Sequence, residues 1–157
     1  MAIELISSAF DNGEAIPRRY TGEGEDFSPP LHWSGIPEGA KELVLVCDDP
    51  DAPTPQPWVH WVIYKIPPTV TELPEGVPPH SRLKLIPGAL QGKNSWHTLG
   101  YRGPMPPADH GPHRYFFRIY AVKAKMVIEA GAEKTAVLRE ISNHVLAEGQ
   151  LMGTYSR

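Results

Sequence analysis

Three residues whose side chains carry acid–base chemistry stand at the ends of apolar segments: Asp49, His60 and His113. Side chains alternate between the two faces of a β-strand, so a count in steps of two assigns each residue to a face. The count places each of the three on an apolar face of its own segment. Where these segments are neighbouring strands, we expect the three side chains to converge on one pocket floor. Two imidazoles beside a carboxylate form a partly cationic site at neutral pH, which suits an anion.

Each of these residues also has a purely structural interpretation. Asp49 precedes Pro50, and such a pair commonly begins a turn. His60 shares its predicted face with Val62 and Tyr64, where a histidine is often a hydrogen-bonded core residue. Two histidines and a carboxylate also match an open metal site. The remaining histidines are expected outside the pocket, in solvent-facing loops or at a helix edge: His32, His80, His97, His110 and His144.

Apolar and β-branched patterning predicts four strands that position these residues. The run Leu43–Cys47 is continuously apolar, which is typical of a strand buried on both faces. The other three segments are Ile3–Ser7, Trp58–Ile66 and Arg114–Val122, and the last two are dense in aromatic and β-branched residues.

One helix is predicted, from about Glu133 to Ala147. Val137, Ile141 and Val145 fall on one apolar stripe at the helical period, and Gly149 is a suitable stop. Three connections are longer than usual loops, so they are expected to be functional or to contain elements of their own. They span Gly22–Gly39, Pro67–Leu83 and Leu90–Pro112.

Composition limits the class of protein. The 157 residues correspond to one domain, 1–157, and 18 prolines with 14 glycines exclude a helical bundle. A net charge of −3 argues against nucleic-acid binding. The single cysteine, Cys47, cannot form an internal disulfide. No signal peptide or transmembrane segment is evident, so a cytoplasmic location is expected. The predicted fold is mainly β, with two packed sheets and a C-terminal helix over one side.

Several motifs resemble those of one known family. Asp49–Pro53, Trp58–Trp61 and Gly111–Tyr115 resemble the two signature regions of the phosphatidylethanolamine-binding protein family, and they are most similar to its bacterial, Raf kinase inhibitor-like branch. Further segments match in family order: Ser28–Trp33, Asn94–Gly100, Gly103–Pro107, His144–Ala147 and Gly153–Tyr155. The resemblance covers nearly the whole chain.

The resemblance implies an antiparallel β-sandwich with a small pocket for phosphate or a phospholipid headgroup such as phosphorylethanolamine. It assigns no catalytic residue, metal or cofactor, and it implies a cis peptide bond at Ala52–Pro53. Some relatives are dimers, so a homodimer is expected. Met105 replaces a cysteine of many bacterial relatives, and Pro112 has no backbone N–H to offer an anion. The ligand-binding positions it assigns are Asp49, His60 and His113, with lining from Asp51, Trp58, Tyr101, Pro106 and Tyr115.

Three functions follow as hypotheses. The preferred one is a small-molecule binding or regulatory protein that carries out no turnover. The second is an inhibitor of a kinase or a protease that acts by protein–protein contact, as relatives are described. The third is a metal-dependent hydrolase or oxygenase, which is less favoured because no further ligand or general base is evident.

Overall fold

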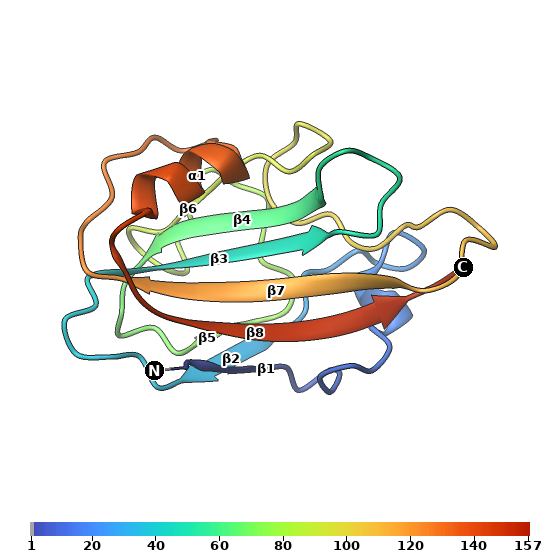
Figure 1. Ribbon diagram of the computed structural model, residues 1–157, viewed down its shortest axis with the longest axis horizontal. Coiled ribbons are helices and arrows are strands. Elements are labelled where there is room, and N and C mark those ends of the chain that lie inside the picture. Colours follow the sequence, from blue (N-terminus) through green and yellow to red (C-terminus); the bar gives the residue numbers. More distant parts are fainter. Residues whose placement is uncertain (1) are drawn as a thin grey trace.

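The computed structural model describes residues 2–157, which form two antiparallel sheets and one α-helix (Figure 1). The helix α1 spans Lys134–Ile141, and a short 3-10 turn, η1, spans Arg18–Tyr20. The smaller sheet has the strand order β1 (Glu4–Ile6), β2 (Leu31–Ser34) and β5 (Glu72–Leu73). The larger has the order β6 (Leu90–Gln91), β4 (Trp58–Ile66), β3 (Glu42–Asp49), β7 (His113–Val122) and β8 (Val145–Tyr155). The predicted mainly-β fold is confirmed.

Strand β3 lies at the centre of the larger sheet, and all eight of its residues are buried. Leu45 and Cys47 belong to the core between the two sheets, whereas Val44 and Val46 belong to a second core that includes residues of α1. Figure 1 shows α1 over the β4 side of the sheet, with the smaller sheet against its other face. The continuous apolar run therefore reflects burial on both faces, as predicted.

The three long connections contain three of the four strands that the sequence pattern did not reveal; the fourth is β8. Strand β2 lies within 22–39, β5 lies within 67–83, and β6 begins 90–112. His32, which was expected in a loop, is therefore a residue of β2, although its side chain is exposed. The rest of 90–112 is irregular and leads into β7.

The predicted helix is too long at its C-terminal end. Helix α1 ends at Ile141, and Asn143 adopts a left-handed φ of 72°, which turns the chain back. Val145 begins β8, and its side chain is 40% exposed. Gly149 lies within β8 rather than at a helix end. An added Cβ there would stand 2.1 Å from the carbonyl oxygen of Ile3, so the close approach of the two segments requires glycine. No helix among residues 2–157 is long and apolar enough to cross a membrane.

The core between the sheets contains one polar contact whose loss is measurable. The Nε1 of fully buried Trp61 donates a hydrogen bond to Oε1 of buried Gln91 at 2.7 Å. Trp61→Phe leaves that oxygen without its partner, so we expect the free energy of unfolding to fall by about 2 kcal/mol. Urea denaturation measures the change. Trp96→Phe, at a half-buried residue, is the matched control, and equal losses in the two variants would contradict the assignment.

Candidate functional site

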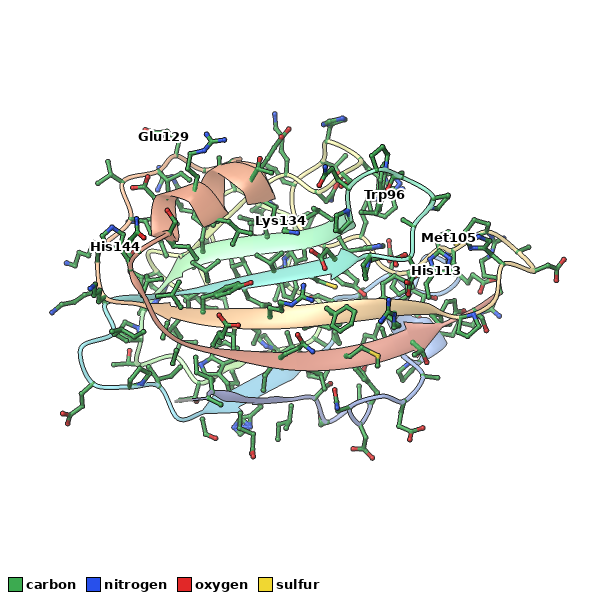
Figure 2. The ribbon with its side chains drawn as sticks, viewed as in Figure 1. Trp96, Met105, His113, Glu129, Lys134 and His144 are labelled. Carbon is green, nitrogen blue, oxygen red and sulfur yellow. The ribbon has the colours of Figure 1, made fainter. Side chains whose placement is uncertain are left out.

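A cavity of about 270 Å³ opens at the end of the larger sheet where β3 ends and β4 and β7 begin. The three ends meet because β4 and β7 flank β3 and both run antiparallel to it. Figure 2 shows Trp96, Met105 and His113 gathered at this end, with Glu129 and His144 toward the other. The cavity is lined by Asp49, Ala52, Pro53, Thr54, Trp58, His60, Trp96, Met105, Pro106, Pro107, His113 and Tyr115.

A β-bulge determines where His60 points. In the pairing of β3 with β4, Cys47 lies opposite Trp61 and Asp48 lies opposite Val59. Two consecutive residues of β3 thus span three residues of β4, which leaves His60 as the extra one. Such an insertion breaks the alternation of side chains at that point of the strand.

The bulge overturns the predicted face of His60. Strict alternation would place it with Val62 and Tyr64, which pack in the core that includes α1. Its ring instead lies edge to face against Tyr115, with 5.2 Å between the ring centroids, and lines the cavity. All three polar residues singled out in the sequence therefore reach the same cavity.

Asp49 and His113 form a buried pair on the cavity floor. The Nδ1 of His113 donates to Oδ2 of Asp49 at 2.6 Å, while Oδ1 accepts the backbone N–H of Asp51 at 2.7 Å. The two paired residues are only 3% and 2% exposed. A carboxylate accepts but does not donate, so it fixes the His113 proton on Nδ1.

His110 extends this pair into a chain of three groups. Its Nδ1 lies 2.6 Å from Nε2 of His113, and the two ring centroids are 4.8 Å apart. The sequence pattern placed His110 in a solvent-facing loop; its side chain is indeed exposed, but one ring nitrogen is in contact with the site. A turn at Asp109 and Gly111, which have φ values of 60° and 82°, brings the two rings together. The Gly-Pro pair between the histidines is the signal that could have indicated this turn.

His60 is anchored by the chain segment that follows the aromatic loop. Its Nδ1 donates to the carbonyl oxygen of Arg102 at 2.5 Å, and the backbone N–H of Arg102 donates to the carbonyl oxygen of His60 at 3.0 Å. Burial lowers the pKa of His60 to about 4, although the Arg102 carbonyl and Asp49 act in the opposite direction. The His60 ring is therefore neutral at neutral pH, with its proton on Nδ1.

Trp58 and Trp96 form an aromatic wall at the cavity mouth. Their rings meet edge to face with centroids 5.4 Å apart, and Trp96 also meets His60 at 5.1 Å. The guanidinium of Arg102 lies 4.7 Å from the centroid of Trp96. Trp96 was not assigned to the site, although it lies in the matching segment Asn94–Gly100, because it belongs to a turn held by the side chain of Asn94 and has no periodic pattern. Aromatic faces of this kind attract cations.

The predicted lining residues divide into two groups. The carboxylate of Asp51 binds the guanidinium of Arg114 at 2.8 and 2.9 Å, and these hydrogen bonds lower the pKa of Asp51 to about 2. The hydroxyl of Tyr101 donates to the carbonyl oxygen of Tyr20 at 2.6 Å, and its ring packs against Trp61. Neither Asp51 nor Tyr101 borders the cavity. The residues that do are Trp58, Pro106 and Tyr115.

The turn after β3 differs from what the resemblance implied. The Ala52–Pro53 peptide bond is trans, and no cis bond occurs anywhere in residues 2–157. A backbone hydrogen bond from Thr54 to Ala52, at 2.7 Å, closes a tight turn around Pro53 that a trans bond accommodates.

The cavity offers few free ligands for a metal. Across the described part of the chain, no three His, Cys, Asp or Glu side chains gather so as to hold a metal ion. Both oxygens of Asp49 and both ring nitrogens of His113 already take part in contacts within the protein.

Comparison with known proteins shows which family has this sequence and this fold. The family model described as phosphatidylethanolamine-binding protein matches residues 6–156. A UPF0098 protein of Methanothermobacter thermautotrophicus is 51% identical over 155 residues, which are 99% of each chain. The structure of CT736 of Chlamydia trachomatis, described as a homologue of phosphatidylethanolamine-binding protein, is 38% identical with a TM-score of 0.88 over 99% of this chain and 98% of its own. The structure of YbcL of E. coli, described as a member of the mammalian family, is 32% identical with a TM-score of 0.92 over 100% of this chain and 99% of its own. Sequence and fold thus agree over nearly the full length, and this chain belongs to the phosphatidylethanolamine-binding protein family.

Proposed function

We propose that this chain is a binding protein whose cavity takes a small phosphoryl anion, such as phosphate or the phosphorylethanolamine headgroup. The observation that carries the proposal is His113, a buried imidazole held by Asp49 at the floor of an aromatic-walled cavity. A protonated His113 donates a charge-assisted hydrogen bond, which is about twice as strong as a neutral one. The cavity volume, about 270 Å³, suits a headgroup rather than a large ligand.

The two cavity histidines have different roles in this proposal. The sequence suggested that both imidazoles share positive charge at neutral pH, but the low pKa of His60 keeps that ring neutral, so the proposal assigns the anion to His113. The Nδ1–H of neutral His60 donates a hydrogen bond to the carbonyl oxygen of Arg102, so its Nε2 carries a lone pair. That nitrogen accepts a hydrogen bond from a phosphate hydroxyl or an ammonium group. A ligand with both an anionic oxygen and a hydrogen-bond donor, such as phosphorylethanolamine, therefore suits the pair.

Isothermal titration in EDTA tests the proposal. Sulfate serves as the probe beside phosphate and phosphorylethanolamine, because its charge does not change between pH 8 and 6 and any change reports on the protein. A site that takes up one proton together with the anion gains up to about tenfold in affinity per pH unit on acidification, and we expect such a rise for sulfate. A constant affinity for all three ligands would contradict the histidine mechanism.

Variants identify the ring that binds. His113→Asn should abolish the binding of all three ligands, while His80→Asn, at an exposed histidine outside the cavity, should leave it unchanged. Membership of the family supports a binding or regulatory role. Contact with a kinase or a protease, a homodimer and a cytoplasmic location stay predictions, and protein contact need not depend on His113.

A further inference from the structure

His110 occupies the nitrogen of His113 that the proposed anion requires. Nδ1 of His113 is committed to Asp49, so Nε2 is the one ring nitrogen left for a ligand, and Nδ1 of His110 lies 2.6 Å from it. We propose that His110 is a displaceable, proton-sensitive cap on the anion site. This inference rests on the proposed function and adds a regulatory and specificity-determining residue to it.

Proton counting explains why the cap is conditional. With no added proton, His110 Nδ1–H donates to the lone pair on Nε2 of His113, because the Asp49 contact keeps the His113 proton on Nδ1. With one added proton, Nε2–H of the His113 imidazolium donates to a neutral His110. With two, both facing nitrogens carry hydrogen and both rings are cationic, so the 2.6 Å contact cannot persist.

The two ends of the pair differ in their freedom to move. His113 is 2% exposed and tied to β3 through Asp49, whereas the His110 side chain is exposed. The backbone around His110 is held by two long hydrogen bonds of 3.3 Å, from its own N–H to Pro107 and from Asp109 to Arg157. His110 is therefore the ring that moves when the contact breaks.

The surrounding charges are largely paired with one another. On the β3 and β7 side these are Asp49, which binds His113 itself, and the Asp51–Arg114 pair. On the β8 side Arg157 lies near Glu23, and Asp109 lies in the loop of His110 itself. The position of the cap thus depends first on protons held by the two rings. An anion competes with neutral His110 for Nε2–H of His113, and a second proton on the rings removes the competitor.

Sulfate titrations of the wild type, His110→Ala and His110→Gln at pH 8 and pH 6 test the cap. His110→Ala removes the competing hydrogen bond, so we expect sulfate to bind about fivefold more tightly at pH 8, with a smaller gain at pH 6. His110→Gln keeps a hydrogen-bonding side chain that cannot gain a proton, so its affinity should stay at or below that of the wild type and rise less on acidification. His80→Ala is the control and should match the wild type.

The outcomes separate this inference from the proposed function. If the wild type binds sulfate and His110→Ala binds it equally or more weakly, the cap alone is overturned. His110 then either has no role in binding or contacts the anion directly. If His110→Ala binds sulfate and the wild type shows no binding, the result supports a tight cap. If neither the wild type nor any variant binds sulfate at either pH, the anion pocket and the cap are overturned together.

Discussion

The free energy of unfolding is expected to fall by about 3 kcal/mol between pH 6.5 and pH 4 because of His60 alone. Burial lowers the pKa of this ring from 6.5 to about 4 in the folded chain. Well above pH 6.5 neither the folded nor the unfolded chain protonates it, so His60 causes no pH dependence there. Below pH 6.5 the unfolded chain takes up a proton at His60 and the folded chain does not. The free energy of unfolding therefore falls by about 1.4 kcal/mol per pH unit until the pH approaches 4.

Urea denaturation at several pH values measures this effect as a difference between proteins. His60→Gln retains an amide N–H for the Arg102 carbonyl but does not titrate, so its stability should decline less than that of the wild type between pH 6.5 and 5. Other acidic groups titrate equally in both proteins and cancel in the difference. His80→Gln, at an exposed ring, should retain the wild-type slope. Parallel curves for the wild type and His60→Gln would show that the folded chain protonates His60 as readily as the unfolded chain does.

The central strands were predictable because their pattern is local. The boundaries predicted for β4 are those observed, and β3 and β7 differ from their predicted ranges by at most two residues at either end. Strands β5 and β6 have two residues each, too few for a period, and they exist only through pairing with distant partners. The false helical extension through Val145 has the same origin. The apolar stripe of Val137 and Ile141 continues at the helical period to Val145, but the left-handed turn at Asn143 redirects the chain into strand β8.

The polar floor of the site was predictable from residue type, but its geometry was not. The count in steps of two along the strand placed Asp49 correctly. His60 reaches the cavity only because of a β-bulge, which strict alternation does not predict. Trp96 and His110 arrive from irregular segments in which no periodicity operates. The motif resemblance identified the family and three residues that line the cavity, Trp58, Pro106 and Tyr115. The two other residues that it assigned to the lining lie outside the cavity: Asp51 binds Arg114, and Tyr101 binds the Tyr20 carbonyl.

The same substitution at two adjacent buried carboxylates is expected to affect sulfate affinity at one and mainly stability at the other. Asp49 is 3% exposed and faces the cavity, and Asp48 is 2% exposed and binds Lys134 and Arg118 instead. Asp49→Asn provides one acceptor where the carboxylate has two. If the amide oxygen stays with Asp51, the amide N–H₂ faces Nδ1 of His113 and disfavours the charged ring. We expect the affinity for sulfate at pH 6 to fall by at least about tenfold, with a stability loss of about 1 kcal/mol.

Asp48→Asn is the matched control, because it removes the same charge one residue away. It weakens two ion pairs, so we expect the free energy of unfolding to fall by about 2 kcal/mol; the loss stays below that of a fully buried pair because Lys134 and Arg118 are 19% and 33% exposed and regain water. Sulfate affinity should remain within about twofold of the wild type, since a charge that is merely nearby contributes little beside a direct hydrogen bond. Equal losses of affinity in the two variants would mean that net charge, rather than the orientation of His113 by Asp49, governs the site. An unchanged affinity in Asp49→Asn would move the anion away from His113 altogether.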